Sequence, residues 1–403
     1  MSLQKRPKSV VIVGAGIAGL STAIHLAEKG VERVTIVDKG KVGDGSSIRA
    51  AGIVTMLQHN PASIRARARS LDIFERFSKI LDGYTFHQVG CLNLMTHQAF
   101  EDNAPMRDIQ NNLGAKIELL RGSELHEKFP DMVAGEDDFG VLDLRGGYSE
   151  PHHYVPALAA KIRSLGVEIR EHEPLTEFAI SGDRVTGVAT ANGETIEAEA
   201  VVCTVNAWAN HVLGLTGQKI PMKNFVHERF VTTPFSRPPR LPAVNENVKD
   251  GYIRPTHDNR LLVGSVAHNP SEFTMPGPDF SLADVEPDPT ALPFLREAMV
   301  ERVPMLADAE WDYHRAGLIS FAMDANPVIG PVPGLHGAYV GVNFHSGGFG
   351  YNPVAGMLLS EYVVDGKTSI DVDDFLPSRF ADVDVDDFLS TPLRHHDMGK
   401  KRH

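Results

Sequence analysis

Cysteine is scarce in this sequence, because its 403 residues include only Cys91 and Cys203. Two cysteines cannot build a disulfide framework or a four-cysteine metal site, and they suit a reducing compartment. Long apolar runs are also missing: none approaches 18 residues, and glycines interrupt the first one after Val13. The sequence therefore predicts neither a membrane span nor a signal peptide, and we expect a cytoplasmic protein.

Positive charge is in deficit, with 39 Lys and Arg against 52 Asp and Glu and a net charge of −13. An acidic surface repels phosphate backbones, so we do not expect nucleic acid as a partner. The 36 glycines and 26 prolines are only slightly above average usage, which excludes collagen-like and low-complexity proteins. The length predicts two or three domains at about 150 residues each.

The first forty residues predict a βαβ unit. The short run 9–13 is rich in β-branched residues and suits a buried strand. Apolar residues at helical spacing follow between 20 and 27, and 34–37 reads as a second buried strand. These three elements in this order are typical of a unit with two parallel strands and a crossover helix.

A dinucleotide site is predicted within this unit. Gly14, Gly16 and Gly19 lie between strand and helix, where they permit a tight turn, close approach to a pyrophosphate and close helix packing. The N-terminus of the helix offers N–H groups and partial positive charge to phosphates. Asp38 follows at the end of the second strand, placed to accept hydrogen bonds from a ribose. The unit alone does not choose between NAD and FAD.

Later segments give weaker signals. Asn60 followed by Pro61 is typical of a helix start, and another helix is expected over 154–165. Strands are expected near 167–170, 176–180, 185–190, 200–204, 230, 261–263 and 339–342, with a last helix near 354–364. After about residue 370 comes an acidic run and then a basic end, and such charge runs are usually solvated or disordered.

Short segments spread over nearly the whole chain follow one another in a specific order. They are 14–38, 45–53, 90–94, 147–151, 184–188, 201–208, 252–255, 261–264, 324–330 and 346–349. This ordered set resembles the D-amino-acid-oxidase-like FAD oxidoreductases, in particular the group of glycine oxidase, sarcosine oxidase and the sarcosine oxidase β-subunit. The opening unit is shared by many flavoproteins, whereas the full set is specific.

The resemblance implies an α/β protein with two domains. A Rossmann-type FAD-binding domain would be discontinuous and comprise 1–83, 146–215 and 317–370. A substrate domain of α+β type, built mainly on an antiparallel sheet, would comprise 84–145 and 216–316. The charged C-terminal tail would comprise 371–403.

The resemblance also implies a set of FAD-binding residues. The 46–52 segment would lie along the pyrophosphate and one face of the flavin, and Leu175 would read the adenine through its backbone. Glycines before the last helix would stabilise negative charge on the flavin N1–C2=O region. The full set is Gly14, Gly16, Ile17, Ala18, Gly19, Asp38, Lys39, Ser46, Ser47, Arg49, Ala50, Ala51, Gly52, Leu175, Asn206, Trp208, Gly317, Gly347, Gly348, Phe349 and Gly350.

The sequence departs from the family at several positions. Gly317 stands near the cysteine that links flavin covalently in some relatives, and Arg49 stands where others carry a linking histidine. The resemblance therefore implies noncovalent FAD. Gly350 replaces a lysine and Ile319 an arginine that hold the substrate carboxylate in relatives. We expect no metal site, since a histidine pair at 395–396 falls in the charged tail.

Four residues are candidates for work on the substrate. Tyr252 aligns with a substrate-facing tyrosine, and Arg254 shares its strand face and could reach a carboxylate. His345 could accept a proton near neutral pH. Arg49 stands where several relatives place a cation near the flavin ring, which would favour the anionic reduced form. Tyr351 and His257 are weaker candidates.

The resemblance implies FAD-dependent oxidation of a small amino acid or N-methylated amino acid, of the sarcosine, glycine or proline type. Hydride would pass to flavin N5, and the imine product would hydrolyse. Three alternatives stay open: a flavin subunit of a heteromeric amine dehydrogenase, oxidation of a 2-hydroxy acid, and an NAD(P)H-dependent flavin monooxygenase. The sequence does not choose between oxygen and another carrier as electron acceptor, or between oligomeric states.

Overall fold

The N-terminal βαβ unit forms part of a six-stranded sheet in a computed structural model that describes residues 6–249, 251–265 and 271–399. The strand order is β19 (Val328–Pro331), β20 (Ala338–Val342), β13 (Ala200–Cys203), β1 (Ser9–Val13), β2 (Arg33–Val37) and β9 (Glu168–Arg170). Neighbours are parallel except β19 and β20. Parallel strands buried on both faces read as continuous apolar runs, as β1 does.

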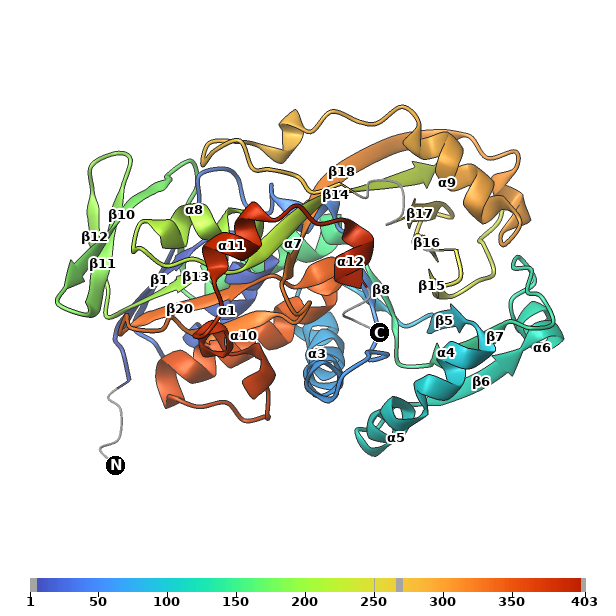
Figure 1. Cartoon of the computed structure of the whole chain (residues 1–403), viewed down its shortest axis with the longest axis horizontal. Helices are drawn as coiled ribbons and strands as arrows, with labels where there is room; N and C mark the ends of the chain where they lie inside the picture. The colour runs from blue at the N-terminus through green and yellow to red at the C-terminus, as the bar shows by residue number, and fades with distance from the viewer. Residues whose placement is uncertain (1–5, 250, 266–270, 400–403) are drawn as a thin grey trace.

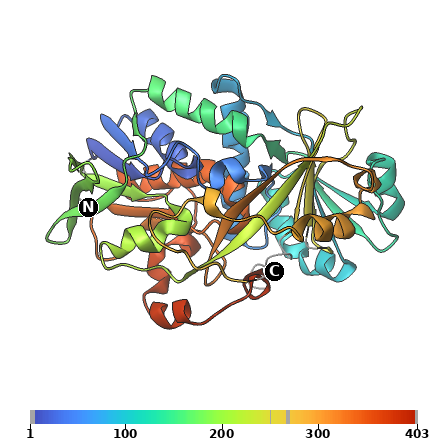
Figure 2. The ribbon, with the colours of Figure 1, turned by 90° about the horizontal axis from the view of Figure 1, so that it is seen from above.

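Four long helices lie beside this sheet. They are α1 (Ile17–Glu28), α3 (Pro61–Ile80), α7 (Pro151–Ser164) and α10 (Gly348–Asp365). Two of them, α1 and α10, contact the strands of the sheet. Helix α1 contacts both α7 and α10, and α10 contacts α3 (Figures 1 and 2). Helix α3 begins as predicted, because the Asn60 side chain accepts a hydrogen bond from the Ser63 N–H at 2.8 Å.

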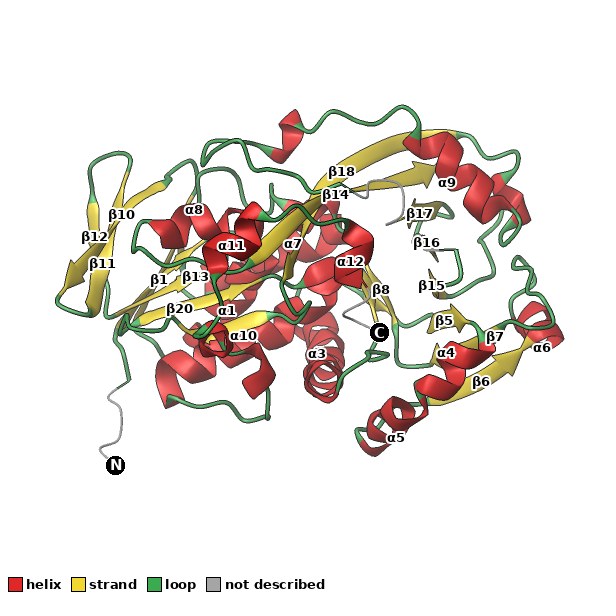
Figure 3. Ribbon diagram, viewed as in Figure 1, coloured by secondary structure: helices red, strands yellow, loops and turns green. Residues whose placement is uncertain are grey.

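An eight-stranded sheet forms the second layer (Figure 3). Its order is β18 (Trp311–Ala322), β14 (Met222–Thr232), β17 (Leu261–Ser265), β16 (Gly251–Pro255), β15 (Ala243–Glu246), β5 (Cys91–Met95), β7 (Phe139–Asp143) and β6 (Ile117–Arg121). Neighbours are antiparallel except β15 and β5. The long paired strands β14 and β18 run from the first sheet toward the outer helices (Figure 1).

Smaller elements complete the described chain. One three-stranded sheet is β10 (Leu175–Ser181), β11 (Arg184–Thr190) and β12 (Thr195–Glu197), and another is β3 (Ile53–Val54), β8 (Gly147–Ser149) and β4 (Phe86–His87). The short helices are α2 (Ser46–Arg49), α4 (His97–Asp102), α5 (Ala104–Asn112), α6 (Gly122–Lys128), α8 (Ala209–Gly214), α9 (Ala291–Val300), α11 (Val385–Ser390) and α12 (His395–Gly399). The 3-10 turns are η1 (Asn206–Trp208), η2 (Leu282–Asp284), η3 (Pro304–Leu306), η4 (His345–Gly347), η5 (Asp373–Phe375) and η6 (Pro377–Phe380).

The expected fold class is confirmed: a Rossmann-type α/β layer is joined to a mainly antiparallel sheet. The exact domain boundaries stay a prediction. Among the helices of the described residues, none has the length and apolar character needed to cross a membrane.

The expectation of a disordered tail is wrong for residues 371–399. Val372, Phe375 and Met398 are fully buried there, although most charged side chains of the segment are exposed. Arg379 joins the segment to the main body through two hydrogen bonds to the Asp324 carboxylate, at 2.8 and 3.1 Å. Apolar residues spaced among the acids supply the packing that the charge pattern conceals. Residues 400–403 lie outside the described part.

Candidate functional site

A cavity of about 1350 Å³ runs from the carboxyl ends of β1, β2 and β13 to the face of the eight-stranded sheet. Ligand crevices of doubly wound sheets lie at these carboxyl ends. The volume exceeds the roughly 300–1,000 Å³ of ordinary small-molecule pockets, so a dinucleotide and a small substrate could share it.

The glycine-rich turn forms one end of the cavity. Gly14 and Gly16 line it, whereas Gly19 packs helix against strand, since a Cβ there would overlap the Gly14 carbonyl oxygen. A Cβ on Gly16 would meet only the Ser47 hydroxyl, at 3.1 Å, and a larger side chain would extend into the cavity. The three glycines therefore differ in what each constrains, as the dinucleotide fingerprint requires.

Asp38 lies where the next strand ends and also lines the cavity. Its carboxylate accepts hydrogen bonds from the N–H groups of Ala15, at 2.6 Å, and Gly40, at 2.7 Å. Burial raises the pKa of Asp38, although these two N–H groups act in the opposite direction. The side chain is thus oriented beside the turn.

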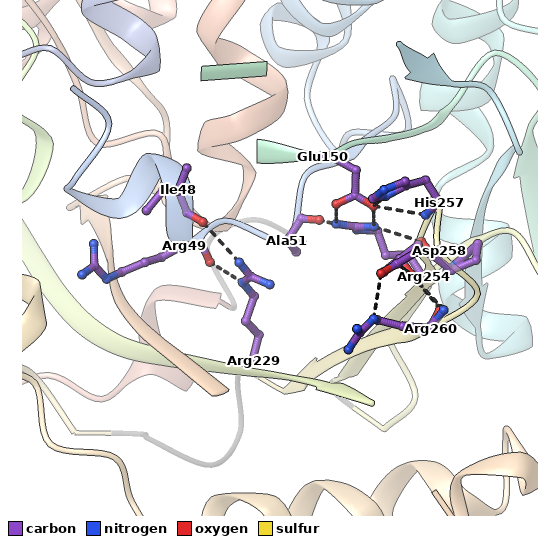
Figure 4. A network of polar contacts seen from close by, with 11 residues as sticks. Ile48, Arg49, Ala51, Glu150, Arg229, Arg254, His257, Asp258 and Arg260 are labelled. Atoms are coloured by element: carbon purple, nitrogen blue, oxygen red, sulfur yellow. Dashed lines mark hydrogen bonds and ion pairs between the residues drawn. The ribbon is translucent and has the colours of Figure 1, made fainter. Parts of the chain in front are cut away.

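Helix α2 and the residues after it form the adjoining wall. The Ser46 hydroxyl donates to the Leu318 carbonyl at 2.7 Å, and the Ser47 hydroxyl oxygen accepts from the Ile17 N–H at 3.0 Å. Arg229 donates to the carbonyls of Ile48, at 3.2 Å, and Arg49, at 2.6 Å (Figure 4). These bonds fix the end of α2 between the two sheets.

Arg49 itself lines the cavity, with its side chain directed away from Arg229 (Figure 4). Its guanidinium donates to the carbonyls of Asp44 and Gly45, and the Asp44 carboxylate lies 3.7 Å away. Burial lowers the pKa of Arg49, opposed by Asp44. The charge is therefore partly neutralised within the protein.

The opposite wall of the dinucleotide end holds an unsatisfied donor. Lys39 lies 4.3 Å over the ring of Trp208, and the buried indole Nε1 of Trp208 has no hydrogen-bond partner among the described residues. Asn206 is held by its side-chain oxygen, which accepts from the Asn343 N–H at 3.0 Å. Trp208, Asn206 and Leu175 all line the cavity. Leaving a buried donor unpaired costs about 1–3 kcal/mol, so the Trp208 Nε1 is an unsatisfied polar group beside the cavity.

The second glycine turn, at the start of α10, meets the cavity further along. Gly347, Gly348 and Phe349 line it, whereas Gly350 does not. The position that a Cβ on Gly350 would take is filled by the guanidinium of Arg67.

Arg67 is a residue that the sequence reasoning missed. Its guanidinium donates to the carbonyls of Thr55, at 2.8 Å, and Gly347, at 2.9 Å, and it is 2% exposed. Of the described residues, none offers it a carboxylate within ion-pair distance. The available signal was its place on the apolar face of α3, between Ile64 and Leu71 at helical spacing.

His345 lies just before the glycine turn that begins α10, and its backbone is in the left-handed conformation, with φ of +46°. Its Nδ1 accepts a hydrogen bond from the Gly347 N–H at 3.1 Å, which in the neutral ring places the proton on Nε2. His345 lines the cavity, and its Nδ1 already accepts this bond, so that nitrogen is not the open proton acceptor expected from sequence.

The end of the cavity beneath the eight-stranded sheet contains Tyr252 and His227, whose rings meet edge to face at 5.3 Å. Burial lowers the pKa of His227 to about 4, so the ring is neutral at pH 7. Its Nε2 is buried with no partner among the described residues. His227 belongs to no motif, and sequence reasoning missed it.

Arg254 lies outside the cavity, contrary to the role expected for it. Its guanidinium donates to both carboxylate oxygens of Glu150, at 3.0 and 2.9 Å (Figure 4). It also stacks 4.5 Å over the ring of Tyr148. The residue is 1% exposed. Strand alternation does place Arg254 on the same face of β16 as Tyr252. Two residues further along the strand, however, that face meets Glu150, which lies just before α7 and pairs with Arg254.

Residues 9–362 match the family described as FAD dependent oxidoreductase (DAO). The 4-methylaminobutanoate oxidase (formaldehyde-forming) of Paenarthrobacter nicotinovorans is 28% identical over 92% of this chain and 45% of its own length. The sarcosine oxidase subunit beta of an Arthrobacter species is 27% identical, over 90% of this chain and 88% of that one.

Among solved structures, the L-proline dehydrogenase from P. horikoshii superimposes with a TM-score of 0.85 and 26% identity, covering 94% of this chain and 99% of that one. The chain spans less than half the length of the first curated relatives it matches. The family match, however, takes in both sheets and the whole glycine-rich cavity wall between Gly14 and Phe349. The chain therefore belongs to the FAD dependent oxidoreductase family.

Proposed function

We propose that this protein oxidises the C–N bond of a small amino acid whose nitrogen is a secondary amine, either N-methylated or cyclic. The observation that carries the proposal is a continuous cavity, which joins the dinucleotide turn to a chamber lined by His227 and Tyr252. The names of the three relatives specify sarcosine, 4-methylaminobutanoate and L-proline, which are all amino acids of this kind. Glycine-type primary amines form the wider class.

Bound FAD would supply the hydride-accepting chemistry. Gly14, Gly16 and the N-terminus of α1 would hold the pyrophosphate, and Asp38 would accept from a ribose hydroxyl. The N–H groups at the start of α10 would face the flavin pyrimidine. Arg67 lies beneath that turn, where a buried cation acts at low dielectric and favours negative charge nearby.

The substrate would lie between the flavin and the eight-stranded sheet. The His227 ring, neutral at pH 7, lines the chamber beside the amine, which must be unprotonated to release hydride. The Tyr252 hydroxyl can donate to a carboxylate. The sheet above these groups excludes water and holds the reacting bond in place.

Anaerobic bleaching of the bound flavin tests this proposal. Sarcosine, N,N-dimethylglycine, 4-methylaminobutanoate, L-proline and glycine would each be added to oxidised protein, and the flavin absorbance followed. We expect bleaching by at least one secondary amino acid and none by lactate or NADPH. Bleaching by lactate alone would favour 2-hydroxy-acid oxidation, and bleaching by NADPH would favour a monooxygenase.

Partner and acceptor are tested with the same preparation. The likeness to a sarcosine oxidase subunit beta keeps a flavin subunit of a heteromer open, and homo-oligomers are equally open. Size measurement in solution and affinity capture from the source cells distinguish a heteromer from a homo-oligomer. Reoxidation in air against reoxidation by an added quinone distinguishes oxygen from another carrier.

Acid precipitation is expected to release the flavin into the supernatant. The described lining contains no cysteine, and Gly317 and Arg49 occupy the positions where relatives carry linking residues. Absorbance of pellet and supernatant after trichloroacetic acid checks this. Yellow colour that stays with washed, denatured protein would show a covalent link, and the histidines of the lining would then be examined.

Tyr252→Phe is expected to raise the substrate concentration for half-maximal flavin reduction about 3- to 10-fold, the worth of one hydrogen bond. The limiting rate should stay within about twofold, since the ring remains in place. Stopped-flow reduction over a substrate series measures both. Tyr362→Phe is the matched control, because the Tyr362 hydroxyl is bonded to Thr368 outside the cavity. An unchanged concentration dependence would remove Tyr252 from the substrate site.

A further inference from the structure

The segment after the family match folds back over the cavity. The match ends at residue 362, whereas α11 and α12 comprise residues between 385 and 399. Figure 1 shows these two helices in red, in front of the junction between the two large sheets. Two residues of the segment, His395 and His396, line the cavity.

Specific contacts anchor the segment on strand β14 and the turn before it. Lys219 pairs with Asp386 at 2.6 Å, and the buried Lys223 ammonium donates to the Leu389 carbonyl at 2.9 Å. Further along, the main chain at Arg394 forms an isolated antiparallel β-bridge with Ser271. A buried lysine aimed at a main-chain carbonyl specifies one position for α11.

Helix α12 then packs its inner face against β14 and β18. Met398 is fully buried with Phe225 and Phe321, which are themselves fully buried. The His395 ring meets these two phenyl rings edge-on, at 5.3 and 5.4 Å. Edge-to-face pairs at such distances fix the orientation of the ring.

His395 also lines the cavity, together with the exposed His396. Phe321 is the link to the substrate end, because its ring stacks on His345 at 6.1 Å and contacts His395. His395 is further close enough to His227 for its charge to act on that ring. The imidazole of His395 thus faces the chamber where the amine would lie.

We infer that the start of α12 forms part of the outer wall of the substrate chamber and that His395 sets the size of the amine that the chamber admits. This inference rests on the proposed function. A side chain that closes a chamber acts by volume: a smaller residue leaves room, and a larger one obstructs the entrance. Two substitutions at one position should therefore change access in opposite directions, which a merely structural role does not predict.

The test uses the FAD-loaded full chain and sulfite, a small anion that bleaches accessible bound flavin without any turnover. Four proteins are compared: wild type, His395→Ala, His395→Trp and His395→Gln. Work at pH 8.5 keeps histidine neutral, so that lost charge does not imitate lost volume. His336→Ala is the matched control, since the His336 side chain is 67% exposed and lies outside the cavity.

We expect bleaching about 10-fold faster in His395→Ala, about 10-fold slower in His395→Trp, and near wild type in His395→Gln and His336→Ala. His395→Ala should also admit N-ethyl and N-propyl amino acids that wild type excludes. Equal rates in Ala, Trp and wild type would overturn the inference, as would a Gln variant that behaves like Ala. If His395→Ala loses its FAD, the ratio of the bleaching rates of His395→Trp and His395→Gln still tests the inference.

Failure of the proposed function is distinguishable from failure of this inference. Sulfite needs bound FAD but no amine oxidation, so a protein that oxidises none of the amino acids can still show the ordered rates. Conversely, if the protein oxidises sarcosine or L-proline but the variants bleach with sulfite at equal rates, the proposed function holds and the inference about His395 fails.

Discussion

Arg254→Met is expected to lower the free energy of unfolding by about 3–5 kcal/mol, the usual cost of removing one partner from a buried ion pair. Glu150 is 7% exposed and receives both hydrogen bonds of the Arg254 fork. Methionine fills the volume but removes the charged fork from that buried carboxylate and leaves it only His257, whose Nδ1 lies 3.5 Å away. Urea unfolding of wild type and variant at pH 7 measures the difference.

The double variant Arg254→Met with Glu150→Met provides the control. Replacing both members by apolar residues of similar volume is often close to neutral, so the double variant should recover much of the loss. A double variant no more stable than the single one would show that the cost comes from packing and not from charge. An Arg254→Met protein as stable as wild type would contradict the ion-pair interpretation altogether.

The pH dependence of this effect has a definite sign. Burial alone would raise the pKa of Glu150, but the charge and hydrogen bonds of Arg254 outweigh it and hold the pKa at about 2, below its ordinary value of 4.5. A lowered pKa contributes stability that is complete above pH 4.5 and is lost as pH falls toward 2. In Arg254→Met the buried carboxyl prefers its proton, so the variant should gain relative to wild type as pH falls. The gap measured at pH 7 should narrow at pH 3.

The βαβ unit could be predicted because its signals are local. The run at Ser9–Val13 is strand β1 within its predicted bounds, and Asn60 begins α3 as its residue type indicates. The order of motifs then identified the family, and the family fixed the pairing of elements far apart in sequence. The fold class and the cofactor therefore followed from the sequence.

The substrate end could not be predicted in the same way, because its geometry depends on distant partners. Glu150 precedes Arg254 by 104 positions, and nothing around either residue signals the other. The Arg67 guanidinium occupies the space that a side chain at Gly350 would need, although the two residues belong to different helices. His395 was assigned to a disordered tail, since charge pattern says nothing of the apolar contacts that Met398 makes.

Gly16→Val is expected to abolish practical FAD binding while leaving the apoprotein folded. A side chain at this position would extend past the Ser47 hydroxyl into the cavity, at the N-terminus of α1 where the pyrophosphate would lie. The phosphate would then lose its N–H contacts. Each hydrogen bond to a charged group is worth about 1.5–3 kcal/mol, so the loss of two weakens binding about 100- to 10,000-fold.

The backbone around Gly16 permits this test, because the residue has φ of −75° and its Cβ would meet no main-chain atom. Gly19→Ala is the contrasting variant: its Cβ would overlap the Gly14 carbonyl oxygen, so it should destabilise the fold itself. Gly214→Val, at an open position outside the cavity, controls for the loss of a glycine. Calorimetric titration of apoprotein with FAD measures affinity, and thermal unfolding without FAD measures the fold. A Gly16→Val protein that binds FAD as tightly as wild type would place the pyrophosphate elsewhere in the cavity.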